Sequence, residues 1–311
     1  MKSFTSLVKD EISHIETAST ECISELSAIV RNCATIKDEI KITTENAAVA
    51  RRIFNLIKTL YEINAKITVR KSPNYHSKNI YILEVGTKKE IILNDLSIVE
   101  NNKYLTIPKP YIVDDEQLTQ AYIRGIFIAT GSINDPKKSR YHLEFLVDDN
   151  NYAKWFSQLL NKLLLNSKVI KRDNKHMIYI KEAEKIGDFL RIMGAYNAIL
   201  YYEDIRIYRD HKNMTNRLNN CEQANVDKII ETSCKQVKAI ETIKKYASLE
   251  SLKEKEKIVA QYRLKYKDAS LVELSEIITA ETNQSITKSG LYHRFKKINE
   301  VANKVKKNKN Q

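Results

Sequence analysis

The chain has 311 residues, a formal net charge of +13 from 52 basic and 39 acidic side chains, and a hydrophobic content of 42%. This length favours two domains, and the hydrophobic content is sufficient for ordinary packed cores. The basic excess makes a polyanion the simplest partner. No run approaches the ~20 apolar residues of a membrane span. Charged residues interrupt the opening segment, so neither a membrane protein nor a signal peptide is expected.

The cysteines and histidines do not suggest a metal site. The four cysteines form no CxxC pair, and the six histidines have no zinc-finger spacing. A structural zinc is therefore not expected, and no cofactor is predicted. The thiols are expected to be reduced, as in a cytosolic protein.

In chain order, residues 4–15 are predicted to form a helix, because apolar side chains recur there at helical spacing, with Glu11 as the exception. A helix is expected next at 21–33, then a strand at 40–43 and a long amphipathic helix at 46–64. Two strands, 66–71 and 79–85, are expected to form a hairpin across SPNYHS, and a helix is expected at 88–99. A connector with two prolines, 107–113, follows.

The same order of elements is expected again downstream. LSAIVRNCATI, Leu26–Ile36, aligns with IRGIFIATGSI, Ile123–Ile133, at an offset of 97 residues, and an offset of 102 then aligns Arg70 with Arg172. Chance similarity between two amphipathic helices is the alternative, which the linked matches disfavour. The prediction is an α+β domain at 1–212 with repeats at about 21–100 and 114–208. Small residues would let the two repeated helices pack closely in a pseudo-twofold seam. These small residues are Ser27, Ala28, Ala34, Gly125, Ala129 and Gly131.

The last third of the chain differs in composition. NRLNNCEQAN, residues 216–225, has little apolar content and indicates a linker at 213–225. An all-α domain is predicted at 226–311. From Asp227 onward, 19 Lys and Arg stand against 11 Asp and Glu. This asymmetry indicates a nucleic-acid partner, although a solvated basic tail is the alternative.

A helix-turn-helix pattern is predicted at about 269–302. A short helix around Leu274 and a polar stretch at 281–285 precede a third helix, for which Thr287 is a good N-cap. The expected core positions of the third helix are Leu291, Phe295, Ile298, Ala302 and Val305. The residues predicted to bind DNA lie mainly on its other faces: Thr287, Lys288, Ser289, Tyr292, His293, Arg294, Lys296 and Lys297. An ordinary three-helix bundle is the alternative.

The two seam helices resemble the paired motifs of LAGLIDADG homing endonucleases. In that family an acidic residue beside the last glycine of each motif holds the catalytic metal. The equivalent positions are Cys33 and Thr130, and neither is a carboxylate, whereas Mg²⁺ prefers oxygen ligands and usually one or two carboxylates. The chain is therefore not expected to be an enzyme or to hold a metal. Asp38 and Asp135 are also equivalent by repeat, but lie five residues beyond these positions.

The LAGLIDADG resemblance also implies a saddle of two sheets that lies over DNA. By analogy, basic strand residues would contact phosphates, which adds salt-sensitive affinity and little sequence information. A solvated sheet face is the alternative. The secondary DNA-binding candidates are Arg70, Lys71, Lys171, Arg172 and Lys175.

Across nearly its whole length the chain resembles the WhiA proteins, bacterial transcription regulators. The similar stretches are FTSLVKDEI, IRGIFIATGSIND, NRLNNCEQAN, SLVELSEI and ITKSGLYHRFKKI. The first repeat departs most, because Ala34 replaces a glycine. The resemblance implies binding to double-stranded promoter DNA without cleavage, and roles in cell division, chromosome segregation and, in some lineages, sporulation. It also implies a cytoplasmic, nucleoid-associated protein, with RNA polymerase or other transcription factors as further candidate partners.

Two other functions remain open from the sequence. One is a metal-dependent LAGLIDADG endonuclease, which would need carboxylates at the seam. The other is a basic RNA-binding protein. Target genes, operator sequence and oligomeric state do not follow from the sequence.

Overall fold

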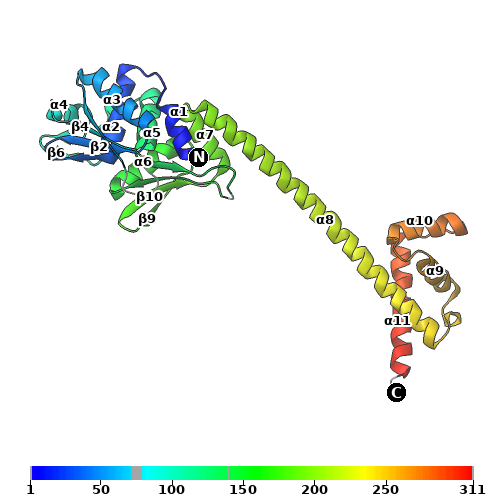
Figure 1. Ribbon diagram of the computed structural model, residues 1–311. Coiled ribbons are helices and arrows are strands. Elements are labelled where there is room, and N and C mark those ends of the chain that lie inside the picture. The colour runs from blue at the N-terminus through cyan, green and yellow to red at the C-terminus, as the bar shows by residue number, and fades with distance from the viewer. Residues whose placement is uncertain (1, 72–78, 139, 310–311) are drawn as a thin grey trace. The chain divides into compact units, whose positions relative to one another are not determined.

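The computed structural model describes residues 2–71, 79–138 and 140–309 (Figure 1). It contains two compact units, Met1–Arg209 and Asp210–Gln311, and each has its own apolar core. The loop expected for the first hairpin falls within 72–78, outside the described residues.

The first unit begins with α1 (Phe4–Ile12) and then repeats one order of elements twice. The first repeat consists of α2 (Ser19–Cys33), β1 (Ala34–Ile36), β2 (Ile40–Thr44), α3 (Ala47–Tyr61), β3 (Lys66–Lys71), β4 (Asn79–Val85) and α4 (Lys89–Asp95). The connection contains β5 (Val99–Glu100), β6 (Lys103–Tyr104) and a short 3-10 helix (Pro110–Ile112). The second repeat consists of α5 (Glu116–Thr130), β7 (Gly131–Ile133), β8 (Leu143–Val147), α6 (Asn150–Lys162), β9 (Lys168–Arg172), β10 (Lys175–Ile180) and α7 (Ala183–Ile192).

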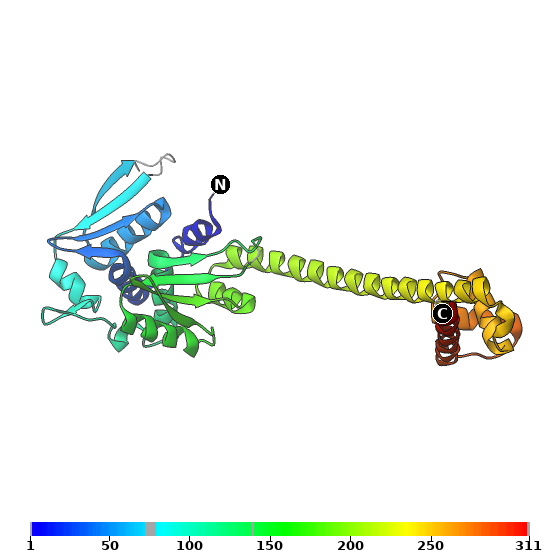
Figure 2. The ribbon, with the colours of Figure 1, turned by 90° about the horizontal axis from the view of Figure 1, so that it is seen from below.

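The two repeats have equivalent sheets. Both are antiparallel and four-stranded, with strand orders β1-β2-β4-β3 and β7-β8-β10-β9. Figure 2 shows the first sheet in blue and cyan and the second in green. The strands β1 and β7 begin at Ala34 and Gly131, which are 97 residues apart. The predicted α+β duplication is confirmed, although the first helix ends at Ile12 and not at 15.

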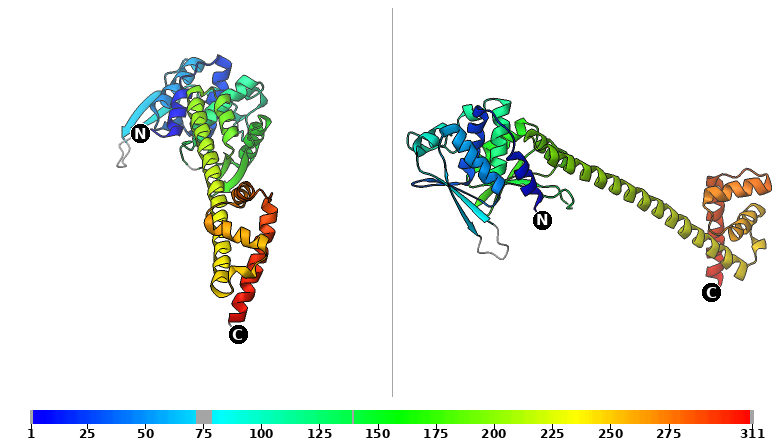
Figure 3. Two further views of the ribbon diagram at one scale, coloured as in Figure 1. Left: turned by 90° about the vertical axis from the view of Figure 1, so that its right-hand side faces the viewer. Right: turned by 45° about the horizontal axis from the view of Figure 1, so that its top comes forward.

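Side-chain caps fix where the longer helices begin. The Asn46 carboxamide oxygen accepts hydrogen bonds from the backbone N–H groups of Ala48 and Val49, at 2.8 and 3.2 Å. Asp115 and Asp149 cap α5 and α6 in the same way. Such caps satisfy N–H groups that have no partner within the helix. The helices lie on one face of the two sheets (Figure 3), which leaves the other face open.

Helix α8 runs from Tyr196 to Tyr246, so the predicted linker at 213–225 lies entirely within a helix. Its first turn is capped by the Glu11 carboxylate, which accepts hydrogen bonds from the backbone N–H groups of Asn197 (2.7 Å) and Ala198 (2.9 Å). An acidic group at a helix N-terminus is also favoured by the helix dipole. This role explains why Glu11 interrupts the apolar stripe of α1.

The second unit packs the end of α8 against three helices, α9 (Glu254–Lys265), α10 (Leu271–Thr282) and α11 (Lys288–Lys309). The apolar side chains of Val226 and Ile230 on α8 are 48% and 49% exposed. The burial of α8 in this unit is concentrated further along, at Ser233, Gln236, Ala239, Ile240 and Ile243. Throughout the described chain, no helix combines the length and the apolar character that a membrane crossing needs.

Candidate nucleic-acid interface

The supporting helix of the candidate interface, α10, has a complete capping box. Ser270 Oγ accepts a hydrogen bond from the Glu273 N–H at 3.2 Å, and the Glu273 carboxylate accepts one from the Ser270 N–H at 2.7 Å. The helix ends at Asn283, whose φ of 51° reverses the chain. Five residues, 283–287, separate α10 from α11, which is longer than the usual turn of the motif.

Helix α11 separates an apolar face from a basic one. Leu291, Phe295, Ile298 and Ala302 are buried as predicted, whereas Val305 is only half-buried. The predicted DNA-binding residues that are exposed on this helix are Lys288, Ser289, Tyr292, His293, Lys296 and Lys297. The helix thus presents hydrogen-bonding and cationic groups to solvent along its first three turns, as a recognition helix must.

Two of the predicted DNA-binding residues differ from the others: one caps the helix and one is half-buried. Thr287 Oγ1 accepts a hydrogen bond from the Gly290 N–H at 3.1 Å, which confirms the predicted N-cap of α11. Arg294 is half-buried. These two side chains are therefore less available to a ligand than His293 and Lys296.

Arg263 packs against α11 and was not among the residues predicted from the sequence. Its side chain is 1% exposed, and one guanidinium nitrogen donates to the carbonyls of Tyr266 (3.2 Å), Lys267 (3.3 Å) and Ala269 (2.6 Å). The guanidinium lies 5.5 Å from the centre of the Phe295 ring on α11. Burial lowers the pKa of Arg263, opposed by the charge of nearby Asp268. In the sequence it is one cation among many in a Lys- and Glu-rich stretch.

The strand register decides which basic residues share the open face of each sheet. Arg70 pairs with Ile80, and Arg172 pairs with Lys175, on the side away from the helices. Lys71 and Lys171 are the neighbours of these arginines in sequence, so they point to the opposite side, although both are exposed at edge strands. Lys71 and Lys171 therefore do not belong to the open surface on which the sequence analysis placed them.

Cations on the open faces are partly neutralised, and two of them, Lys41 and Lys66, were not among the predicted residues. Lys41 and Lys66 lie 3.1 and 3.6 Å from the Glu84 carboxylate between them. On the second sheet, Arg172 lies 3.5 Å from Glu144 and Lys175 lies 3.1 Å from Asp148. The period of two along β3 could have identified Lys66 and Arg70 as members of one face.

The two positions that correspond to the metal-binding acids lie at the ends of α2 and α5. Cys33 Sγ donates to the Ile29 carbonyl at 3.1 Å, and Thr130 Oγ1 donates to the Ile126 carbonyl at 3.3 Å. Burial raises the pKa of the Cys33 thiol to about 12, with Lys9 acting in the opposite direction. A protonated thiol and a neutral hydroxyl do not fit the oxygen-rich ligand set that Mg²⁺ requires.

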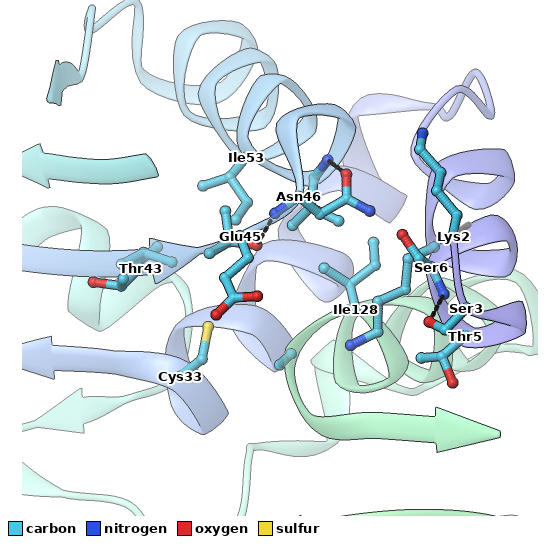
Figure 4. A pocket seen from close by; sticks show the side chains of 15 residues that line it. Lys2, Ser3, Thr5, Ser6, Cys33, Thr43, Glu45, Asn46, Ile53 and Ile128 are labelled. Carbon is cyan, nitrogen blue, oxygen red and sulfur yellow. Dashed lines mark hydrogen bonds between the residues drawn. The ribbon is translucent and has the colours of Figure 1, made fainter. Parts of the chain in front are cut away.

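The remaining acids near the seam do not complete a metal site. Asp38 follows β1, and Asp135 accepts a hydrogen bond from the Lys137 N–H in a turn after β7. Glu45, which the sequence analysis missed, lines the same cavity as Cys33 (Figure 4). Within the described ranges, no three His, Cys, Asp or Glu side chains gather closely enough to hold a metal ion.

The fold and these surfaces define a class of protein: a duplicated LAGLIDADG-like scaffold followed by a helix-turn-helix domain. Three family models match in the same order. They are the WhiA N-terminal LAGLIDADG-like domain at residues 19–99, the WhiA LAGLIDADG-like domain at 119–212 and the WhiA C-terminal HTH domain at 215–302. The chain belongs to the WhiA family.

Relatives match over the full chain. A "Probable cell division protein WhiA" from Staphylococcus carnosus is 38% identical over 309 residues, which cover 98% of each chain. One from Brevibacillus brevis is also 38% identical, and 99% of each chain is covered. The crystal structure of full-length DUF199/WhiA from Thermatoga maritima matches with 25% identity and a TM-score of 0.58, covering 97% of this chain and 99% of that one.

Proposed function

We propose that this protein is a non-catalytic transcription regulator of the WhiA type that binds double-stranded promoter DNA through α11. The supporting observation is that α11 is capped, is held against the core of the second unit next to Arg263, and exposes its basic face. The names of the relatives add a role in cell division. The resemblance to the family further implies roles in chromosome segregation and, in some lineages, sporulation, and the proposal includes them. The proposed location is the cytoplasm, on the nucleoid.

In this proposal His293, Lys296 and Ser289 reach base edges in the major groove, because they point away from the buried face of α11. Lys288 and Lys297 lie at the flanks and contact phosphates. The open sheet faces add phosphate contacts through Arg70 and Arg172, or bind another partner such as RNA polymerase. Phosphate contacts would weaken as salt rises, whereas base contacts would decide the preferred sequence.

Replacing His293 and Lys296 together by Ala is expected to weaken specific DNA binding by more than ~1 kcal/mol, because two groups that reach base edges are removed. Fluorescence anisotropy with a promoter fragment selected by chromatin immunoprecipitation measures the change. The matched control is His211→Ala with Lys212→Ala, which removes the same two residue types from an exposed stretch of α8. Unchanged affinity of the α11 variant, with binding lost when the first unit is deleted, would refute the assignment.

Incubation of the protein with supercoiled plasmid and Mg²⁺ is expected to produce no nicked DNA, because the two seam positions offer no carboxylate. Agarose gel electrophoresis measures the topological state of the plasmid. Nicking that Asp135→Ala or Glu45→Gln abolishes would establish the endonuclease alternative. Competition between duplex DNA and structured RNA at fixed salt separates the proposed function from RNA binding.

A further inference from the structure

A cavity of about 770 Å³ lies beside the ends of the two seam helices (Figure 4). Lys2, Ser3 and the α1 residue Ser6 form one side, and the other side carries Cys33 and Glu45. This volume is within the range of small-molecule sites in proteins. The proposed DNA-binding function makes no use of it.

The wall of the cavity has an apolar part and a polar part. The apolar part consists of Ile42, Val49, Ile53, Ile128 and Ala129. Much of the polar part is already occupied: Thr5 Oγ1 bonds to the Ile133 backbone at 2.9 and 3.0 Å, and Lys2 pairs with Asp10 at 2.6 Å. Asn46 caps α3 and donates to the same aspartate. The cavity could therefore hold an apolar body, and its remaining polar groups decide what else it accepts.

Lys9 is the charged group that remains on this wall. Its ammonium has no carboxylate within ion-pair distance in the described ranges, and it lies 5.7 Å from the centre of the Phe127 ring. Burial lowers the pKa of Lys9 to about 8, with Cys33 acting in the opposite direction. A half-buried cation without a counter-ion is unfavourable, so an anion that entered the cavity would relieve this cost.

We propose that this cavity binds a small organic anion, in which a carboxylate or phosphate meets Lys9 and an apolar body contacts Ile53 and Ile128. The hydroxyls of Ser6 and Thr43 also line the cavity, and neither makes a hydrogen bond to another described residue. They can donate to the same anionic group.

The other charged groups on the wall do not change this assignment. The Lys2 ammonium is neutralised by Asp10. Glu45 also lines the cavity but is not without a partner, and Cys33 stays protonated because the pKa of its thiol is about 12. A divalent cation would find one carboxylate and one neutral thiol here, which is too few oxygen ligands. An anion is therefore the better match.

The probes are 4-phenylbutyrate and phenyl phosphate, with neutral 4-phenylbutanamide for comparison. They are titrated into the full-length protein by isothermal calorimetry, while the isoleucine methyl signals are followed by NMR. At least one anion is expected to bind roughly 10-fold more tightly than the amide, a difference that equals about 1.4 kcal/mol. The anion that binds better identifies the carboxylate or the phosphate as the natural group. Its affinity is expected to fall above pH ~8, as Lys9 loses its proton.

Three variants make the test specific. Lys9→Met keeps the apolar length of the side chain and is expected to remove the preference for the anion, whereas Lys9→Arg retains it. Lys58→Met, which removes an exposed lysine from α3, is expected to change nothing. The proposal is overturned if neither anion binds, if the amide binds as well as the anions, or if the folded Lys9→Met variant keeps the preference.

Discussion

Replacing Glu25 by Gln is expected to lower the free energy of unfolding of the first unit by about 3–5 kcal/mol. The Glu25 carboxylate lies on α2 and its side chain is fully buried. It accepts two hydrogen bonds from Arg52 of α3, from Nε at 2.8 Å and from Nη2 at 2.7 Å. Arg124 of α5 approaches the same carboxylate at 3.6 Å. One anion thus serves two cations at the seam between the repeats.

The loss is large because Gln keeps the shape of the side chain but not its charge. The Arg52 guanidinium, 10% exposed, would then lack its counter-ion, and the Arg124 guanidinium, 6% exposed, would keep only Glu21. Burial acts to lower the pKa of Arg52, but the hydrogen bonds and charge of Glu25 outweigh it and raise this pKa. Removing one partner of a buried ion pair lowers stability strongly, because the other charge stays buried without a partner. Replacing both partners by apolar residues costs much less stability.

Urea unfolding, followed by circular dichroism, measures the change for the first unit. The matched control is Glu21→Gln: Glu21 binds Arg124 at 2.9 Å, but its side chain is 21% exposed. Water can replace most of that interaction, so the control is expected to lose less than about 1 kcal/mol. Equal losses for the two variants would show that Glu25 is not the centre of the network.

The network also shows what sequence patterns can and cannot predict. The offset of 97 residues placed Cys33 and Thr130 correctly at equivalent helix ends, because a duplication preserves the order of elements. Glu25 and Arg52 are 27 residues apart on different helices, and no local period connects them. A charged residue in an apolar helix pattern is only an exception to that pattern in the sequence, and the folded structure shows which group it contacts. Glu11 is a second example.

For the candidate interface, the limits of prediction have different causes. The core positions Leu291, Phe295 and Ile298 followed from helical spacing, which is a local property. Lys71 and Lys171 were assigned to the open sheet faces by charge alone, and the alternation of side chains along a strand places them on the other side. The helical state of 213–225 was missed because its polar composition is equally compatible with a solvated helix and a loop.

The second large effect is expected at Gly125, where α5 lies directly against the backbone of α2. A Cβ atom at this position would lie 2.3 Å from the Glu25 carbonyl oxygen and 2.8 Å from the Ala28 Cβ. The first contact is with backbone, so rotation of a side chain cannot relieve it. Gly125→Ala is expected to destabilise the first unit by about 1–3 kcal/mol despite the better helix propensity of Ala, and Gly125→Val by more than about 3 kcal/mol.

The comparison that tests this steric cause is Gly290→Ala on α11. An added Cβ there would meet Thr287 Oγ1 at 3.4 Å, an ordinary contact, so the second unit is expected to gain roughly 0.5–1 kcal/mol. Differential scanning calorimetry of both variants measures the opposite signs. If Gly125→Val unfolds at the same temperature as the unchanged protein, the two helices are not in backbone contact at this point. Helix spacing at Gly125 would then not set the positions of Cys33 and Thr130, and the cavity beside them would have to be held open by α1 and α3 instead.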